Sequence, residues 1–551
     1  MNRISKKLPP FIRIDSDINF KPRNRIHNSL RIYLVPAVIT AVLLIFTIRL
    51  FHLTLVKGAF YKFASEDNHL TEIAIEGKRG TIFDRKGQKL AFSEDAEKKF
   101  KRNYVDGEAY GHMLGYRQIA SAENIKNDAC KQPLRLNDRL GVKGIEKLFE
   151  CTLRATKGRE LIETNAKGKF VKTISKVEPI PGKDITLSLD SELQKKTYDA
   201  IMQNTIKSNE ISDYSTKKIS VIALKPGTGE VLAMLSYPSF DPQAFEDNET
   251  STVQGYLKNT EQPLYNRALL GTYPPGSVFK PVIAAAALQE KAVSPTELIE
   301  DTGFIEVGTN KQIFRNWFYT KYGKMDGMVD MVKGLQRSND IYFYRLGEKL
   351  GSDKIKKWSH TFGFGKHTGI NLDDSTGVVP SDFWKRERLG EKWYLGDTYN
   401  LSIGQGYLLT TPIQIALSTA VFAQNGDYCL PQILKISDVI KPHCTSLKLA
   451  KETLETIREG MKKACETGGT GWPFFTFEPV TKGQKVTVGC KTGTAESHLK
   501  SGIPHAWFTI FAPFEKPEIV VTVLVEEGGE GSNVAAPIAK EILTSYFQRN
   551  Q

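Results

Sequence analysis

The sequence predicts an α+β protein with an N-terminal membrane helix, a β-rich segment beside it and a larger C-terminal domain. Three observations support this fold class. An uncharged apolar run extends from Ile32 to Ile48, β-like runs occupy two distant regions (219–235 and 486–526), and mostly helical sequence lies between those regions. Strands from two distant regions with helices between them favour one antiparallel sheet with inserted helices.

The apolar run resembles an uncleaved membrane-spanning helix more than a signal peptide or a buried core helix. Apolar sequence resumes after Arg49 and ends at Val56. A spanning helix needs about 20 residues, and Arg49 can extend its guanidinium to the membrane surface. The run is longer than a signal-peptide core, and no small-residue cleavage site follows it. We therefore expect a transmembrane helix at 32–56.

Charge distribution predicts the topology and argues against nucleic-acid binding. Residues 1–31 carry eight Lys/Arg and two Asp, whereas the remaining residues carry 67 and 60. A basic flank stays cytoplasmic, so we expect a cytoplasmic tail at 1–31 and everything after 56 on the opposite, normally oxidising side of the membrane. That compartment permits disulfides. Six cysteines allow many pairings, of which Cys130–Cys151 and Cys429–Cys444 are hypotheses based on closeness in sequence.

Two regions follow the membrane helix. Residues 57–182 are rich in charge and glycine with short β-like runs, which predicts a partly β pedestal, and 183–551 forms the larger domain. Short Gly- and Pro-bearing links join the β-runs within each group, and short links require antiparallel neighbours. The expected strands are Ile219–Leu224, Val231–Leu235, Val486–Cys490, His505–Ala512 and Ile519–Glu526. The expected helices are Val278–Lys291, Val329–Gln336, Ile341–Leu350, Thr411–Ala423 and Val534–Gln548.

The first candidate catalytic element is Ser277-x-x-Lys280. Pro274 and Pro275 cannot lie inside a helix, so the helix is expected to begin near Ser277, with the hydroxyl and the amine one turn apart on one face. Serine needs an adjacent base to become a nucleophile, and a desolvated lysine can serve. Ser-x-x-Lys also occurs at Ser215/Lys218 and Ser497/Lys500, but only Ser277 opens a long apolar helix.

Two further elements stand in the chain after Ser277. Ser338-Asn339-Asp340 lies between two expected helices, and its structural interpretation is a helix cap, which Ser and Asp both favour. The segment Lys491-Thr492-Gly493-Thr494 ends a β-run. A strand edge carrying an ammonium and two hydroxyls suits a substrate carboxylate, and the glycine lets a ligand backbone approach. Its structural interpretation is a solvated edge lysine beside a turn.

The order Ser-x-x-Lys, Ser-x-Asp, Lys-Thr-Gly is the motif set of penicillin-binding proteins and class A β-lactamases. On these motifs the chain resembles class B penicillin-binding proteins, the D,D-transpeptidases of peptidoglycan synthesis. The resemblance implies a single-pass protein of the bacterial inner (cytoplasmic) membrane, with a periplasmic or extracytoplasmic catalytic domain. Further matching segments are Arg79–Ala91, Gly141–Glu146, Ser236–Pro242 and Gly404–Gly406. Asp340 and Phe314–Trp317 are more similar to the elongation type, penicillin-binding protein 2, than to the septal, division-specific type.

The resemblance implies a fold and a set of roles. The 183–551 domain would contain a five-stranded antiparallel sheet flanked by helices, and 57–182 would be a dimerisation-domain-like pedestal. Ser277 would be acylated, Lys280 would be its base, and Ser338 would relay protons. The substrate-binding residues would be Asp340, Lys491, Thr492, Gly493 and Thr494, and the backbone amides of Ser277 and Thr494 would form the oxyanion hole.

The resemblance also implies partners. Substrates would be peptidoglycan stem peptides, inhibitors would be penicillins and other β-lactams, and a membrane-embedded SEDS-family glycosyltransferase would supply glycan. No cofactor is needed. Some relatives hold a metal near the second motif through a Cys and a His; here Asn339 and Gly323-Lys324 stand there, so no metal is expected. Only about twenty residues separate Ala91 from His112, so the head subdomain usual in elongation enzymes is shortened.

Other functions share part of this pattern. A β-lactamase needs a Glu in Glu-x-x-Leu-Asn, but Pro133 stands at that position before Leu136-Asn137. A D,D-carboxypeptidase differs only in using water as the acceptor, so the sequence leaves such a side activity open. A membrane-anchored penicillin sensor without catalysis would need an output module, and the 31-residue tail leaves little room for one.

Overall fold

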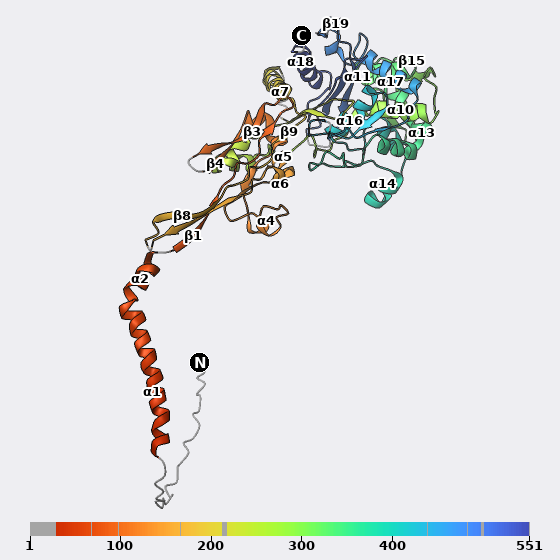
Figure 1. Cartoon of the computed structure of the whole chain (residues 1–551). Helices are drawn as coiled ribbons and strands as arrows, with labels where there is room; N and C mark the ends of the chain where they lie inside the picture. Colours follow the sequence, from red (N-terminus) through yellow and green to blue (C-terminus); the bar gives the residue numbers. More distant parts are fainter. Residues whose placement is uncertain are drawn as a thin grey trace, which may run out of the picture. The chain divides into compact units, whose positions relative to one another are not determined.

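A computed structural model describes residues 29–67, 69–96, 99–165, 167–211, 218–437, 439–481, 483–497 and 501–549 (Figure 1). Most of the predicted cytoplasmic tail lies outside these residues. The chain divides into two units, 1–73 with 159–177, and 74–158 with 178–551. The predicted domain boundaries after residues 31, 56 and 182 remain predictions.

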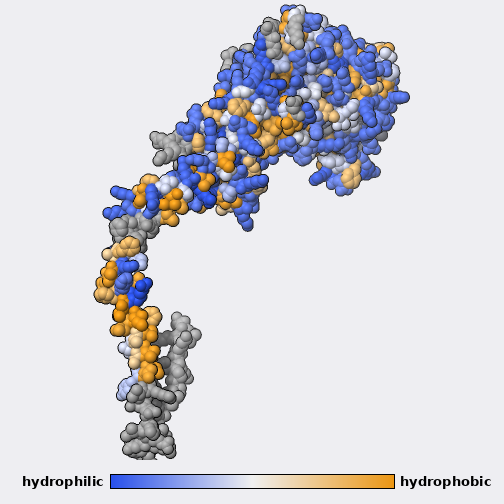
Figure 2. Space-filling view, viewed as in Figure 1, coloured by the Kyte–Doolittle hydropathy of each residue, from blue (hydrophilic) through white to orange (hydrophobic). Residues whose placement is uncertain are grey.

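The first unit contains the predicted membrane helix. Helix α1 (Ser29–Phe51) continues through a short π-helix (His52–Val56) and is followed by α2 (Gly58–Asp67). Residues Tyr33–Val56 are long and apolar enough to cross a membrane, and none of the window is buried. Figure 2 shows this apolar surface in orange. A sheet in the order β1-β7-β8 follows, made of His69–Ile75, Gly158–Thr164 and Phe170–Val177.

The pedestal part of the second unit carries a four-stranded sheet in the order β4-β3-β2-β9. In the region where the sequence predicted a shortened head subdomain, β3 and β4 form an antiparallel pair that begins at Ala91↔Tyr104, and α3 follows directly. The strands are β2 (Ile82–Phe83), β3 (Lys89–Ala96), β4 (Lys99–Tyr104), β9 (Ile185–Thr186), β5 (Arg117–Ile119) and β6 (Arg139–Gly141). The helices are α3 (Gly107–Leu114), α4 (Ala122–Lys126), α5 (Gly144–Leu148) and α6 (Glu150–Leu153).

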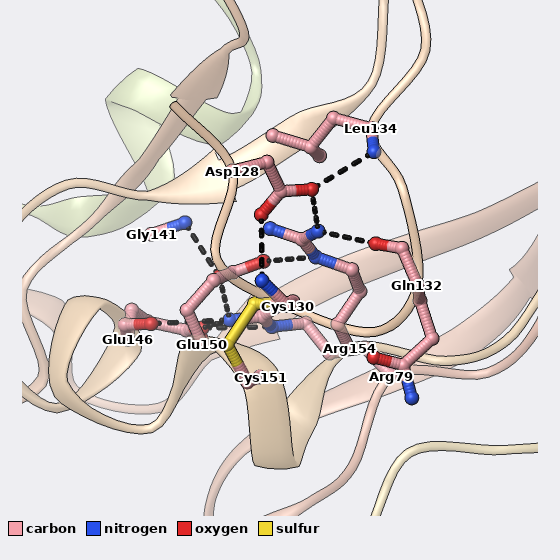
Figure 3. Close-up of a disulfide and its surroundings, with 10 residues drawn as sticks. All are labelled: Arg79, Asp128, Cys130, Gln132, Leu134, Gly141, Glu146, Glu150, Cys151 and Arg154. Carbon is pink, nitrogen blue, oxygen red and sulfur yellow. Dashed lines mark hydrogen bonds and ion pairs between the residues drawn. A yellow bond between two sulfur atoms is a disulfide. The ribbon is translucent and has the colours of Figure 1, made fainter. Parts of the chain in front are cut away.

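A buried ion network joins two of the segments that carry the family resemblance (Figure 3). The Arg79 guanidinium lies 2.6 Å from carboxylate oxygens of both Glu146 and Glu150. Burial alone would raise the pKa of Glu146, but Arg102 and Arg79 lower it to about 2. The Cys130–Cys151 disulfide joins the neighbouring loop to α6. This disulfide confirms the first pairing that the sequence suggested.

The five-stranded antiparallel sheet is confirmed in the order β11-β10-β22-β21-β20. Its strands are Val231–Tyr237, Ile219–Leu224, Ile519–Val525, His505–Ala512 and Gly489–Ala495. Side chains of β22 alternate between two cores: Val521 and Val523 pack with α7 (Ser191–Ile211) and α18 (Ala535–Gln548), whereas Val520 and Leu524 face α16 (Pro412–Ala423). This period of two is the pattern of a strand buried on both faces.

The remaining elements lie between β11 and β20. The helices are α8 (Pro242–Glu246), α9 (Thr250–Lys258), α10 (Lys280–Gln289), α11 (Trp317–Tyr322), α12 (Met331–Arg337), α13 (Asp340–Thr361), α14 (Asp382–Leu389), α15 (Leu395–Ser402) and α17 (Lys451–Ala464), with 3₁₀ turns η2 (Gly276–Phe279) and η3 (Trp472–Phe474). The strands are β12 (Ile299–Asp301), β13 (Phe304–Val307), β14 (Gln312–Arg315), β15 (Gly327–Val329), β16 (Asp427–Cys429), β17 (Cys444–Ser446), β18 (Val480–Thr481) and β19 (Gln484–Lys485).

Two further disulfides lie in this domain. Cys429 and Cys444 are paired residues of β16 and β17, which confirms the second sequence hypothesis. The remaining pair, Cys465–Cys490, joins the end of α17 to β20 one residue before Lys491. The sequence left this pairing open, because 25 residues separate the two cysteines and only the fold brings them together.

Candidate active site

The nucleophile candidate lies in a tight turn rather than at the start of an α-helix. The sequence predicted a helix from about Ser277, but Gly276–Phe279 is a 3₁₀ turn and α10 begins at Lys280. The difference is physical: Pro281 at the second position of α10 has no N–H, and Gly276 adopts φ +56°. In a 3₁₀ turn residues three apart eclipse each other, so Ser277 and Lys280 share one side, with Ser277 partly exposed and Lys280 buried.

Lys280 is held by the second motif. Its Nζ lies 2.6 Å from Asp340 Oδ1, 2.8 Å from the Ser338 carbonyl oxygen and 3.4 Å from Ser338 Oγ. The other Asp340 oxygen accepts the Trp317 N–H at 2.9 Å. These contacts direct the Asp340 carboxylate at Lys280, as expected of a group that positions the amine, whereas the resemblance implied a substrate-binding role.

The motif does cap the following helix, as its structural interpretation expected, but through Asn339 rather than Ser338 or Asp340. Ser338 ends α12 in the left-handed region at φ +54°, and Asn339 caps α13 by accepting the Tyr342 N–H. The Asn339 amide in turn donates to Asp301 at 2.9 Å and to Asp326 at 3.1 Å. The residue between Ser338 and Asp340 therefore anchors the motif, through carboxylates that the sequence did not single out.

The third motif reaches the same place. Lys491 Nζ donates to Ser338 Oγ at 2.8 Å and to the Thr492 carbonyl at 3.0 Å. Lys280, Ser338 and Lys491, from three distant segments, thus form one buried contact chain centred on the Ser338 hydroxyl. Thr492 Oγ1 donates to Thr470 Oγ1 at 2.7 Å, and Thr494 is exposed at the strand edge.

Contacts between backbones bring the first and third motifs together. A Cβ on Gly276 would lie 2.8 Å from the Thr494 carbonyl oxygen, and one on Gly493 would lie 3.1 Å from the Pro275 carbonyl oxygen. β20 is an edge strand, and Gln405 donates to the outward Thr494 carbonyl at 3.3 Å. The N–H and C=O of one strand residue point to the same edge, so the Thr494 N–H faces the Ser277 turn.

Burial favours the neutral form of both amines. Desolvation lowers the pKa of Lys280, although Asp340 partly raises it. The pKa of Lys491 is lowered well below its ordinary value by desolvation and by the neighbouring Lys280. A neutral amine can accept a proton, and the Ser338 hydroxyl lies within reach of both nitrogens. The site can therefore take a proton from a nearby hydroxyl and pass it between the lysines.

The two other Ser-x-x-Lys copies, Ser215/Lys218 and Ser497/Lys500, each have one residue, Ser215 or Lys500, outside the described residues. Leu136 and Asn137, the pair examined for a β-lactamase base, line a pedestal cavity with Arg79 and Lys157, away from the segments that hold Ser277. Among the described residues no group of three or more His, Cys, Asp and Glu side chains is placed to hold a metal ion.

Sequence reasoning missed several polar groups of the site: Asp301, Asn316, Asp326 and Thr470. Asp301 Oδ2 accepts from the side-chain amides of Asn316 and Asn339 and from the Asp326 N–H. Asn316 belongs to the Phe314–Trp317 segment and accepts the Asp340 N–H at 3.2 Å. No motif pointed to Asp301 or Thr470, because single Asp and Thr residues carry no signal until the fold brings them together.

Comparisons with known proteins agree with this geometry. The penicillin binding protein transpeptidase domain family matches residues 219–544, and the penicillin-binding protein dimerisation domain matches 94–187. The chain therefore belongs to the penicillin-binding transpeptidase family. It is similar to the peptidoglycan D,D-transpeptidase MrdA of Haemophilus influenzae, at 32% identity over 480 residues that cover 82% of this chain and 70% of that protein.

Solved structures of penicillin-binding protein 2 and of a peptidoglycan synthase complex are also similar to this chain. Pseudomonas aeruginosa PBP2 in complex with WCK 5153 superposes with a TM-score of 0.71 at 32% identity, covering 86% of this chain and 96% of that chain. A chain from a solved structure on the structural coordination of polymerization and crosslinking by a peptidoglycan synthase complex superposes with a TM-score of 0.75 at 26% identity. The match covers 95% of this chain and 99% of that chain. Within the family, the chain is of the class B, elongation-type PBP2 kind.

Proposed function

We propose that the protein is a membrane-anchored peptidoglycan D,D-transpeptidase that cross-links stem peptides during cell elongation and is acylated by penicillins. One observation carries the proposal. Beside the Ser277 turn, a single buried cluster contains Lys280, Ser338, Asp340 and Lys491. The similarity to MrdA and PBP2 proteins supports the elongation role over the septal one.

In the first half-reaction, Ser277 Oγ attacks the carbonyl carbon between the two terminal D-alanines of a donor peptide. The hydroxyl proton moves to neutral Lys280, as the lowered pKa of that amine favours. The carbonyl oxygen becomes an oxyanion, which the N–H groups of Ser277 and Thr494 would stabilise. The C–N bond then breaks, and the departing D-alanine amine takes a proton through the Ser338 hydroxyl.

The second half-reaction reverses the proton path. An amine of a second stem peptide attacks the Ser277 ester, loses a proton to the Ser338–Lys280 pair, and releases the serine. The terminal carboxylate of the donor would be bound by the hydroxyls of Thr492 and Thr494, with Lys491 behind them and Gly493 leaving space for the peptide backbone. β20 is the sheet edge, so a peptide can add to it as a further strand.

Two finer points belong to the same proposal. The catalytic domain lies on the periplasmic side, because the basic residues before the membrane helix favour a cytoplasmic N-terminus. Glycan strands come from a membrane-embedded SEDS-family glycosyltransferase, in keeping with the similarity to a chain from a peptidoglycan synthase complex. The apolar helix Tyr33–Val56 is the segment through which such a membrane partner would be reached.

The decisive experiment is covalent labelling of the membrane-bound protein with a fluorescent penicillin. Ser277→Ala removes the attacking oxygen, so labelling should vanish while thermal stability and membrane association stay unchanged. A matched control is Ser215→Ala, which alters another Ser-x-x-Lys serine and should label fully. Labelling retained in Ser277→Ala, or rapid turnover of the bound penicillin as in a β-lactamase, would contradict the proposal.

A further inference from the structure

One cavity of the larger domain begins at Trp472, two residues after Thr470, whose hydroxyl contacts Thr492 of β20. It encloses about 690 Å³ and is lined by η3 and the segment after it together with α7 and α18. Ligand pockets in proteins enclose about 300–1,000 Å³. The lining residues are Asn204, Trp472, Pro473, Phe475, Thr476 and, on α18, Pro537, Lys540, Glu541, Thr544 and Ser545. No role in the acyl-transfer reaction involves any of them.

The floor of this cavity is an aromatic turn with two opposite faces. Phe474 and Phe477 are buried, and Phe474 stacks on Phe508 of β21 with ring centroids 5.3 Å apart. Trp472 and Phe475 lie on the other face, and Trp472 is 52% exposed. Both rings line the cavity, and an aromatic ring offers a ligand a large, rigid apolar face. The inner pair therefore fixes the turn to the sheet, and the outer pair faces the cavity.

The turn is rigidly joined to the catalytic strand. Gly471 N donates to the Ala464 carbonyl at 2.7 Å, and a Cβ on Gly471 would lie 2.8 Å from Cys490 Sγ of the Cys465–Cys490 disulfide. Thr470, two residues before Trp472, bonds Thr492 of β20. The Trp472 indole N–H donates to Asn533 at 3.3 Å, which fixes the plane of the ring. The aromatic face is thus preorganised beside the substrate-binding strand.

The opposite rim of the cavity is polar and carries both hydrogen-bond donors and hydrogen-bond acceptors. Asn204 donates to Glu541 at 3.1 Å, and Lys540 donates to Thr476 Oγ1 at 3.1 Å. Amide, carboxylate, ammonium and hydroxyl groups together can donate to and accept from adjacent hydroxyls. An open aromatic face opposite such a rim matches a pyranose ring, whose C–H face is apolar and whose edge carries hydroxyl and amide groups.

We infer that this cavity, here named the Trp472 groove, binds the sugar chain of the peptidoglycan strand that carries a stem peptide into the cleft. The inference rests on the proposed function, and it adds a glycan subsite to the peptide site. Trp472 stacks on one sugar ring, and Lys540 and Glu541 bond its hydroxyls. Binding there holds the peptide's attachment point close to Thr492, which raises the local concentration of the stem peptide at Ser277.

The test uses the full-length protein in detergent and uncross-linked glycan strands from which an amidase has removed every stem peptide. Wild type should bind these strands, and Trp472→Ala should bind about tenfold more weakly, because it loses the stacking surface. Trp472→Phe keeps a ring and should retain most of the affinity. Phe383→Ala is the matched control, because it removes another exposed aromatic, 71% exposed on α14, away from the groove.

Penicillin acylation of Ser277, which requires no glycan, is measured on the same samples to report whether the cleft is intact. If wild type is acylated but does not bind stripped strands, or if Trp472→Ala binds them as wild type does, the groove proposal is wrong and the transpeptidase proposal stands. If strands bind but Ser277 is never acylated, the transpeptidase proposal fails instead. If Trp472→Ala binds glycan as wild type does but loses a membrane protein that copurifies with wild type, the surface binds a protein and the groove proposal is wrong.

Discussion

The pair of Lys280 and Asp340 gives a sharp prediction about how Ser277 is activated. The Asp340 carboxylate lies 2.6 Å from Lys280 Nζ, and the two side chains are 10% and 0% exposed. Its second oxygen holds the Trp317 N–H at 2.9 Å. The substitution Asp340→Asn removes the charge and keeps the shape, so it separates a role in holding Lys280 from the substrate-binding role that the sequence implied.

The magnitude follows from the geometry. At 2.6 Å and an effective dielectric constant of about 20, the pair attracts by about 6 kcal/mol. Desolvation of the two charges offsets part of this attraction, and breaking a buried pair costs about 3–5 kcal/mol. Since Lys280 can give up its proton in the variant, we expect the free energy of unfolding to fall by the lower value, about 3 kcal/mol. A domain with a stability of about 5–15 kcal/mol stays folded.

The assay is the rate of acylation by a chromogenic penicillin, measured as a function of pH. Acylation should rise with pH as Lys280 loses its proton. The carboxylate raises the pKa of Lys280, so its removal lowers that pKa and moves the acid limb to lower pH. The plateau should fall about 100-fold, equivalent to about 2.7 kcal/mol, because the amine is no longer held in place.

Asp382→Asn is the matched control, because Asp382 forms an exposed ion pair with Arg386 on α14 and should leave the whole profile unchanged. An unshifted acid limb, with the loss confined to the apparent affinity for penicillin, would refute the positioning role and restore the substrate-binding interpretation of Asp340.

Two other predictions concern the geometry around the motifs. Gly276→Ala should abolish penicillin acylation without releasing the protein from the membrane, because a Cβ at φ +56° would lie 2.8 Å from the Thr494 carbonyl; normal labelling would contradict the contact. Replacing Cys465 and Cys490 by serine opens a 25-residue loop and should reduce the free energy of unfolding by about 3.5 kcal/mol and slow acylation through Lys491. The same change at Cys429 and Cys444 should reduce thermal stability alone, so equal acylation rates in both pairs of variants would refute the link to Lys491.

The sequence predicted the sheet well, because strands and their links carry local signals. The turn at 226–229 predicts that the two strands beside it pair, and the nearly continuous apolar run at 519–525 predicts a strand buried on both faces. The long helix α7 was missed: it is broadly polar, with buried positions such as Leu193 and Ile201, and its partners (α18, α3 and the sheet) are distant in the sequence. Tertiary packing, rather than local periodicity, stabilises such a helix.

The motifs gave the candidate catalytic residues but not their arrangement. Spacing predicted that Ser277 and Lys280 share a face, and the 3₁₀ turn retains that relation. Nothing in the residues around 338 showed that Asn339 would be the cap, because Ser, Asn and Asp all favour that position. The choice depends on Asp301 and Asp326, which bind the Asn339 amide and stand far from it in the chain.

The backbone of Ser338 shows how the site constrains the fold. Ser338 ends α12 at φ +54°, a conformation in which a residue other than glycine costs of the order of 1–3 kcal/mol. A glycine would relieve that strain but would lose the hydroxyl that contacts both Lys280 and Lys491. The left-handed turn also directs the Ser338 carbonyl to Lys280 at 2.8 Å. These contacts to both lysines offset the strain, and in the proposed mechanism they carry the proton between the half-reactions.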